Sequence, residues 1–331
     1  MKYLNFLIII IIGALLFGLT SCGGNSQTTP STTSTTSTTS TTSTVPTPSP
    51  IGLNLTADPG IRVANASVPF VLKLADDSYR IFFTPGSPEG SNTALSSNCY
   101  DFTVEPKDTV KGTGSDTTVL KIGSYYRIFY LDHKETMEGP MMRTEYSRVK
   151  SATSETGLDF TQGVSIVYAG GSSDSNIVGV PDEIILPDGR IRMFYVGDFY
   201  GKNNVRTAIS TDGGASFTFE AGNICGDDDA KPGPNTYVDP DIIRLPDGTY
   251  RLYTMSAKDG ETKIYSFYST DALNFTLDSG ARLKPSDFTN PKVTMLFDPE
   301  AVLLPDGSIR IFCGARIEGS DNMCIVSATS R

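Results

Sequence analysis

The polar and apolar positions of the chain repeat in a unit of two short apolar runs joined by a tight turn. The three clearest copies are residues 180–195, 239–254 and 298–313. In each copy the turn is Pro-Asp-Gly and the second run is rich in β-branched and aromatic residues, a pattern typical of a β-hairpin. Residues 68–84 and 116–131 are weaker copies. The pattern therefore predicts five similar hairpins.

A second repeated element follows the first four hairpins. It begins with Ser and closes with Phe-Thr in residues 96–103, 154–161, 210–218 and 269–276. The copy at residues 210–218, Ser-Thr-Asp-Gly-Gly-Ala-Ser-Phe-Thr, resembles the Asp-box of sialidases and other propeller enzymes, whose hydroxyl, carboxylate and glycine fix a hairpin turn. Each unit then holds four strands, which predicts one blade of a β-propeller.

The two ends of this region complement each other. The fifth unit stops at residues 327–331, where its second turn should begin, and residues 54–62 match residues 274–282 in phase. We therefore expect an all-β, five-bladed propeller of four-stranded antiparallel blades over residues 51–331, with the last blade closed by the N-terminal strand. Such closure removes unpaired strand edges. An open solenoid or two sandwiches is the alternative, but neither explains the matching ends.

The first residues resemble a bacterial lipoprotein signal. Lys2 precedes an apolar run over residues 7–17 that is short for a membrane span, and Leu-Thr-Ser-Cys22 follows it like a lipobox. We expect a signal peptide over residues 1–21, a lipid on Cys22, and an extracytoplasmic protein anchored to a bacterial membrane, at the cell surface or outer membrane. An ordinary secretory signal is the alternative. Residues 22–50 repeat Ser-Thr-Thr without charge, which predicts a flexible spacer.

Charge and cysteine content narrow the partners. The formal charge of −10 disfavours nucleic acid and anionic lipid as partners, so we expect membrane contact through the lipid alone, and a monomer. Disulfides persist outside the cytoplasm. Cys313 and Cys324 flank one predicted hairpin symmetrically, so they either form a disulfide or are two free buried thiols. The pairing of Cys99 and Cys225 stays open. Because His133 is the only histidine and no Cys-x-x-Cys occurs, a zinc site is not expected.

Acidic residues gather at the start of the predicted inner strands. Those that follow the proline of the last three units are Asp182, Asp241 and Glu300. Those that lie just before this position are Asp116, Asp239 and Asp298. If the inner strands line a channel, these carboxylates converge on one mouth and raise one another's pKa. Glycoside hydrolysis needs one protonated and one ionised carboxyl group. The alternative is that these carboxylates fasten neighbouring blades by bonding backbone amides.

Other acids fall in the turns. Asp188, Asp247 and Asp306 belong to the Pro-Asp-Gly turns, and Asp212 and Asp271 to the second turns. Asp at such positions stabilises a turn through its own side chain. We expect these residues to be structural.

The repeated Asp-Pro-x-Ile-Ile-x-Leu-Pro-Asp-Gly-x-Tyr-Arg pattern looks like that of the five-bladed glycosidases, the arabinanase, levansucrase and invertase superfamily. The resemblance covers essentially residues 51–331. It implies three acids on successive blades that act as base or nucleophile, pKa modulator and general acid, and by position it assigns these roles to Asp182, Asp241 and Glu300 in an order that stays open. The first blade departs from the pattern, because Ser-Val68-Pro stands where the family has an acid.

Further residues are expected at the same mouth. Loop residues His133, Arg143 and Arg316 are candidates for contacts to sugar hydroxyls or carboxylates, and Tyr200 and Tyr237 for stacking on a sugar face. Asp116, Asp239 and Asp298 complete the predicted substrate-binding set. A central Ca²⁺ near His133 would suit the oxygen ligands, the alternative being a plain exposed histidine, and no other cofactor is expected. The sequence thus predicts a surface glycosidase for an extracellular glycan or, alternatively, a non-catalytic propeller that binds glycan or protein.

Overall fold

Residues 50–331 form one compact unit in the computed structural model. The structure describes residues 49–85, 91–138, 141–171, 174, 177–197, 204–225, 237–257 and 260–330. The predicted signal peptide, Cys22 and nearly all of the spacer lie outside these residues. Within them, no helix has the length and hydrophobicity that a membrane span requires.

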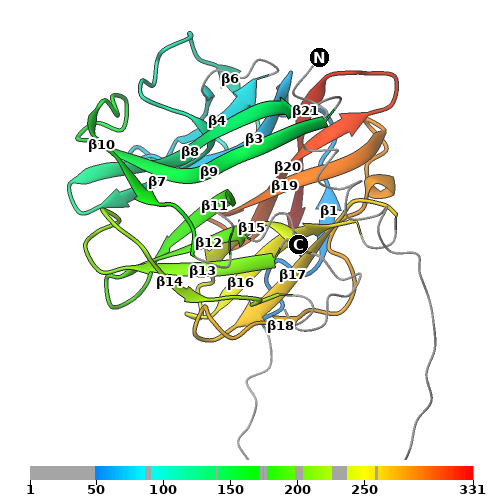
Figure 1. Ribbon diagram of the computed structural model, residues 1–331. Coiled ribbons are helices and arrows are strands. Elements are labelled where there is room, and N and C mark those ends of the chain that lie inside the picture. The colour runs from blue at the N-terminus through cyan, green and yellow to red at the C-terminus, as the bar shows by residue number, and fades with distance from the viewer. Residues whose placement is uncertain are drawn as a thin grey trace, which may run out of the picture. The chain divides into compact units, whose positions relative to one another are not determined.

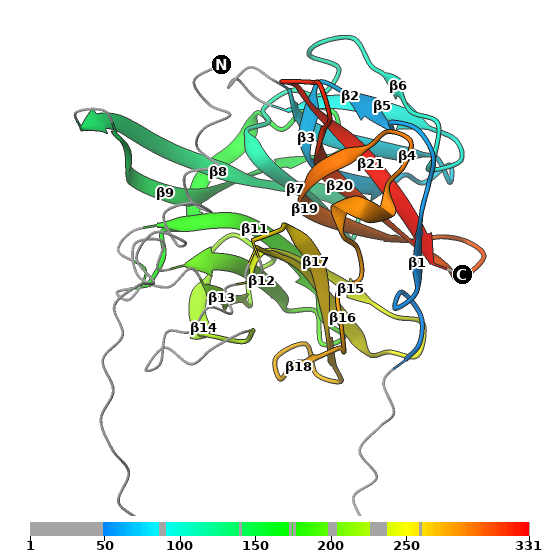
Figure 2. The same cartoon turned by 90° about the vertical axis from the view of Figure 1, so that its right-hand side faces the viewer.

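The strands form five antiparallel sheets, each following the predicted order of a blade (Figures 1 and 2). Blade 1 contains β3 (Ala66–Lys73), β4 (Tyr79–Pro85), β5 (Asn92–Ser96) and β6 (Thr103–Val104). Blade 2 contains β7 (Ser115–Ile122), β8 (Tyr125–Glu138), β9 (Met141–Ser154) and β10 (Gln162–Tyr168). Blade 3 contains β11 (Val178–Ile185), β12 (Ile191–Gly197), β13 (Asn204–Ser210) and β14 (Thr218–Ala221). Blade 4 contains β15 (Val238–Arg244), β16 (Tyr250–Ser256), β17 (Lys263–Ser269) and β18 (Thr276–Leu277).

Blade 5 joins the two ends of the chain, as the sequence predicts. It contains β19 (Val293–Leu303), β20 (Ile309–Ile317) and β21 (Met323–Ser330), and β1 (Leu55–Ala57) and β2 (Val63–Ala64) both pair with β21. Leu55 lies opposite Ser330 and Ala57 opposite Ala328. The N-terminal strand therefore occupies the outer place that the last unit lacks.

The ring closes through its first strands and through apolar cores between blades. Each inner strand contacts the next in the cycle β3, β7, β11, β15, β19 and back to β3. One core packs Val302, Phe312 and Ile325 of blade 5 against Val71 and Ile81 of blade 1. The alternating apolar positions that predicted the strands are thus buried at the faces where blades meet.

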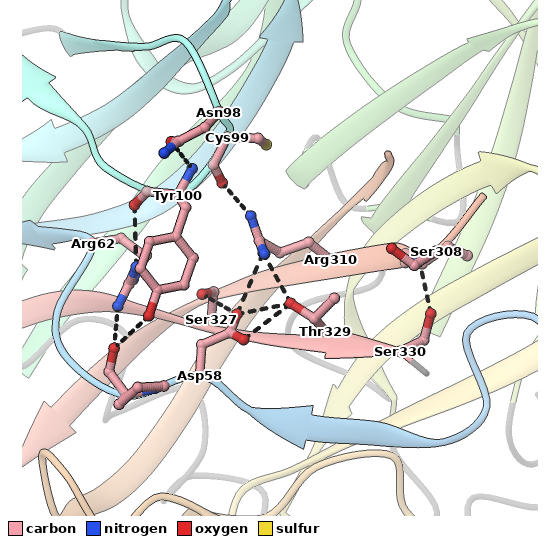
Figure 3. Close-up of polar contacts among 12 residues, drawn as sticks. Asp58, Arg62, Asn98, Cys99, Tyr100, Ser308, Arg310, Ser327, Thr329 and Ser330 are labelled. Atoms are coloured by element: carbon pink, nitrogen blue, oxygen red, sulfur yellow. Dashed lines mark hydrogen bonds and ion pairs between the residues drawn. The ribbon is translucent and has the colours of Figure 1, made fainter. Parts of the chain in front are cut away.

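A charged clamp holds the closing strand (Figure 3). Asp58 follows β1 and accepts hydrogen bonds from Ser327 Oγ at 2.7 Å and from Thr329 Oγ1. The Nε atom of Arg310, on β20, lies 3.3 Å from Asp58 Oδ2. Its Nη1 donates a hydrogen bond of 2.8 Å to the carbonyl oxygen of Cys99 in blade 1. This clamp joins blade 5, its N-terminal strand and blade 1.

An arginine–carboxylate pair recurs at the same place in three other blades. The pairs are Arg80–Glu105, Arg192–Glu220 and Arg251–Asp278. The arginine comes from the second strand, and the carboxylate lies three residues after the Phe of the Phe-Thr element. Blade 2 has Gly163 at that place, and its Arg127 donates to Ser151 Oγ at 2.8 Å instead.

The turn acids behave as the sequence predicts. Asp188, Asp247 and Asp306 each accept the backbone N–H two residues further on, at 3.0–3.1 Å. In the second turn of blade 3, Asp212 accepts the N–H of Ser216, and Ser210 Oγ accepts the N–H of Gly214. These carboxylates stabilise turns on the face opposite the strand starts.

The predicted disulfide between Cys313 and Cys324 is wrong. Both residues are free and buried thiols, as are Cys99 and Cys225. Cys313 lies opposite Val326 and Cys324 opposite Ala315, so the two cysteines are diagonal neighbours offset by two residues. Diagonal neighbours are about 7–8 Å apart, too far for the Cβ···Cβ separation of about 3.5–4.5 Å that a disulfide needs.

The buried ion pairs yield a test of blade stability. In Glu220→Ala the guanidinium of Arg192, whose side chain is 5 % exposed, loses its carboxylate. We expect the free energy of unfolding to fall by about 2–4 kcal/mol, because an unpaired buried charge is strongly unfavourable. Glu318→Ala breaks the exposed pair with Lys292, and we expect a change below about 1 kcal/mol. Urea denaturation of both variants checks this, and equal changes would contradict it.

Candidate functional site

The five inner strands share one distortion at their mouth end. Each has a register shift there, and each places one non-glycine residue in the left-handed region, namely Val68 (φ 50°), Asp116 (47°), Val180 (43°), Asp239 (54°) and Asp298 (45°). Such bulges re-aim side chains and are typical of functional positions. Their repetition in every blade turns equivalent residues toward the axis.

A small cavity lies on this axis. It has a volume of about 30 Å³, enough for one or two water molecules. Each inner strand contributes three consecutive residues to its wall, those of blades 2 to 5 beginning with Asp116, Val180, Asp239 and Asp298. All six acids that the sequence places at the strand starts are among the lining residues.

The predicted catalytic acids fasten the blades together. Asp182 accepts the N–H of Ile242 in blade 4 at 2.8 Å, and Asp241 accepts that of Ala301 in blade 5 at 3.1 Å. Glu300 accepts the N–H of Val71 in blade 1 at 2.8 Å. We call these three carboxylates the strap acids. Buried N–H groups require acceptors, and the strap acids supply them by bonding backbone amides of the next blade, which is the alternative that the sequence offered. This placement does not support the roles in acid–base chemistry assigned to them by resemblance.

The strap acids are also hard to ionise. Burial raises the pKa of Asp182 to about 7. Burial first, and then repulsion by the neighbouring carboxylates, raises the pKa of Asp241 and of Glu300 well above the usual range. Only part of this set carries charge at neutral pH.

A second set of carboxyl groups lies closer to the mouth. Asp239 and Asp298 are each 4 % exposed and Asp116 is half-buried. Within the described part of the chain, Asp239 Oδ2 and both oxygens of Asp298 lack a hydrogen bond. We call Asp116, Asp239 and Asp298 the mouth acids. These oxygens of Asp239 and Asp298 are buried. The backbone amides of Asp298 and Val68 lie close enough to lower the pKa of Asp239 and of Asp298, respectively, against the effect of burial.

Two of the mouth acids, Asp116 and Asp239, titrate near neutrality. Burial raises the pKa of Asp116 to about 6 and that of Asp239 to about 7. Burial, with repulsion from Asp239 and then Asp116, raises the pKa of Asp298 well above the usual range, and the nearby amide of Val68 opposes this only in part. The set therefore combines protonated and ionised carboxyl groups at neutral pH.

The other predicted ligand contacts have mixed outcomes. His133 is exposed and lies within strand β8, where its charge lowers the pKa of Asp116. The prediction that Tyr237 stacks on a sugar face is wrong, because Tyr237 is 3 % exposed and packs edge-on against Tyr265 and Phe267. Arg316 lies in strand β20.

Two further predicted ligand contacts involve side chains that the structure does not describe. Tyr200 is outside the described residues, and of Arg143 only the backbone is described, on β9 opposite Thr136. Across the described ranges, no group of three or more His, Cys, Asp or Glu side chains is placed to hold a metal ion. No ligand group of this kind is therefore found for the predicted central Ca²⁺ among these residues.

One buried acid was not anticipated. Glu183 is 4 % exposed and its Oε2 accepts a hydrogen bond from the Thr118 hydroxyl of blade 2. Burial raises its pKa well above the usual range. The sequence signal is that Glu183 stands where the other blades have an apolar residue, namely Val71, Val119, Ile242 and Ala301. This bond replaces the carboxylate strap between blades 2 and 3.

Comparisons with known proteins identify the fold. No family model matches the chain, and no curated protein does. Solved structures do match. The fold of this chain is that of the five-bladed glycoside hydrolases. A thermostable family-43 glycoside hydrolase has a TM-score of 0.58 and 14% identity over 83% of this chain and 92% of that one.

Two more matches have the same fold. The endo-arabinase from Bacteroides thetaiotaomicron has a TM-score of 0.55 and 12% identity over 83% of this chain and 97% of that one. The Bombyx mori family-32 β-fructofuranosidase BmSUC1 has a TM-score of 0.58 and 13% identity over 83% of this chain and 62% of that one. The resemblance expected from the sequence is confirmed for the fold.

The buried carboxyl groups predict how stability depends on pH. A carboxyl group whose pKa is raised on folding binds more protons in the native chain than in the unfolded one, so the free energy of unfolding falls as pH rises through the native pKa. The native pKa is about 6 for Asp116 and about 7 for Asp182 and Asp239. We therefore expect Tm to fall by at least about 3 °C between about pH 5.5 and pH 8.5.

The matched variants isolate the cause. Asp239→Asn removes one buried titrating group and should reduce this fall, whereas Asp77→Asn, on an exposed turn, should leave it unchanged. Thermal unfolding followed by circular dichroism measures both. A Tm that rises with pH over this range would refute the assignment.

Proposed function

We propose that this protein is a glycoside hydrolase that acts on an extracellular glycan at the mouth of its central cavity. The observation that carries the proposal is the set of mouth acids, which line one cavity on the axis. Asp239 Oδ2 and both carboxyl oxygens of Asp298 lack a hydrogen-bond partner among the described residues. The named enzymes of the same fold, an endo-arabinase and a β-fructofuranosidase among them, support the substrate class.

The raised pKa values suggest a division of labour. Asp298, whose pKa is raised well above the usual range by burial and then by repulsion from Asp239 and Asp116, keeps its proton and donates it to the oxygen of the scissile bond. Asp116, with a pKa of about 6, is ionised at neutral pH and acts as base or nucleophile. Repulsion from Asp239, and then from Asp116, contributes to the raised pKa of Asp298. This pairing is what glycoside hydrolysis requires.

The second candidate is glycan binding without hydrolysis. It is favoured by the narrowness of the cavity, about 30 Å³, and by the 4 % exposure of Asp239 and Asp298. In that case the sugar contacts the rim and the mouth acids serve only the fold.

We also propose the location that the sequence suggests. The lipobox-like residues before Cys22 and the uncharged spacer support a lipid-anchored protein outside the cytoplasm. The propeller would then act on polymers at a bacterial surface.

Hydrolysis is testable with a panel of arabinan, xylan, fructan and aryl glycosides. For a substrate that the wild type cleaves, Asp298→Asn should lower kcat/KM by at least about 100-fold, because it removes the proton donor. Asp247→Asn, in a turn on the opposite face, should retain full activity. Full activity of Asp298→Asn and of Asp116→Asn would refute these roles. Binding of a glycan without cleavage by the wild type would support the second candidate.

Anchoring is testable by fractionation of bacteria that express the full chain. Wild-type protein should partition with membranes and release an acylated N-terminal peptide that mass spectrometry identifies. Cys22→Ser should appear in the soluble fraction, because it lacks the thiol that carries the lipid. A membrane-bound Cys22→Ser protein would contradict the proposal.

A further inference from the structure

Arg316 stands on the mouth side of the mouth acids. Arg316 of β20 lies opposite Met295 of β19. Met295 comes three positions before Asp298 on β19, the inner strand, which runs inward from the mouth. Gly314 is two residues away on β20, so Gly314 and Arg316 face the same side of the sheet. A Cβ atom at Gly314 would lie 3.4 Å from Asp298 Oδ2 and 3.7 Å from the backbone N of Val68. The face that carries Arg316 is therefore turned toward Asp298 and blade 1.

Arg316 is a cation without a partner among the described residues. It is half-buried, and its Nε is buried without an acceptor. Four other arginines have such an Nε, namely Arg62, Arg127, Arg206 and Arg282. Each of these four is nevertheless held by a hydrogen bond or an ion pair. An unsatisfied buried donor is unfavourable in the free protein, so Arg316 is suited to a ligand that brings an acceptor.

The mouth acids leave a gap in their ring beside Arg316. They come from blades 2, 4 and 5, whereas blade 1 contributes the uncharged Val68 and Phe70 to the cavity. Because Arg316 faces blade 1, an anionic group of a ligand would meet a guanidinium there rather than a carboxylate.

Gly314 keeps the space between Arg316 and Asp298 open. The register of the inner hairpins places Thr84, Leu131, Val196 and Met255 at the equivalent position of the other blades. Blade 5 alone has no side chain there. A side chain as large as those would fill the space next to the Asp298 carboxyl group.

We propose that the glycan bound at this mouth is acidic, and that Arg316 binds the carboxylate of a uronic acid residue next to the bond above Asp298. The inference rests on the proposed function and specifies its substrate class. Arginine presents parallel N–H groups that match both oxygens of a carboxylate. The protonated mouth acids reduce repulsion of such a ligand near and below neutral pH.

The test compares oligogalacturonate with the oligogalactoside of the same length and linkage, by isothermal titration calorimetry on the full-length protein at pH 6. We expect the wild type to bind the acidic sugar at least tenfold more tightly. Arg316→Met should remove this preference. Arg316→Lys keeps the charge but loses the planar guanidinium, so it should retain part of the preference for the acidic sugar. Gly314→Val should weaken binding of both sugars by filling the space beside Asp298. Arg244→Met, at an exposed strand end on the opposite face, is the matched control and should bind like the wild type.

The outcomes separate this inference from the function on which it rests. Equal or tighter binding of the neutral sugar by the wild type, or an acidic preference that survives Arg316→Met in a variant with wild-type Tm, would overturn the role of Arg316 and leave the glycosidase proposal standing. Failure of the wild type to bind or cleave any glycan of either kind would overturn the glycosidase proposal and, with it, this one.

Discussion

The structure depends on how the blades satisfy backbone N–H groups where they meet at the axis. Inner strands of neighbouring blades contact one another but do not share a sheet, so the ladder cannot supply the acceptors. Carboxylates supply them instead at three of the five junctions, through the strap acids. At a fourth junction Thr118 and Glu183 form a side-chain bond. A buried N–H without an acceptor would weaken each junction.

This solution concentrates acids where they are buried and thereby sets their chemistry. Burial disfavours the charged form of these carboxyl groups, and repulsion by neighbouring carboxylates further raises the pKa values of Asp241, Asp298 and Glu300. Among the mouth acids, Asp239 and Asp298 have carboxyl oxygens without a hydrogen-bond partner in the described part of the chain. The features that hold the ring together thus also prepare a set of carboxyl groups with mixed protonation at neutral pH.

Ring closure places a second demand on the chain. The last blade needs a strand from the other end, and the pairing of β1 with β21 is short. The clamp of Asp58, Arg310 and Thr329 strengthens it with partly buried, charged hydrogen bonds. The same arginine position is paired with a carboxylate in blades 1, 3 and 4, which indicates that one device fastens outer strands around the ring. Only the copy in blade 5 connects residues distant in sequence.

The sequence by itself determined the five units, their four strands, the split last blade, the turn acids and the convergence of acids on one mouth. These follow from local periodicity and turn chemistry, which depend on neighbours along the chain. The tertiary structure alone decided which acids hold blades together. Asp239 and Asp241 are two residues apart, but Asp239 has a left-handed backbone at the bulge, whereas Asp241 accepts the N–H of Ala301 in the next blade. The tertiary structure also showed Cys313 and Cys324 to be diagonal rather than opposed and Tyr237 to be buried. Strand register and packing between distant segments set these outcomes, and a repeat pattern does not encode them.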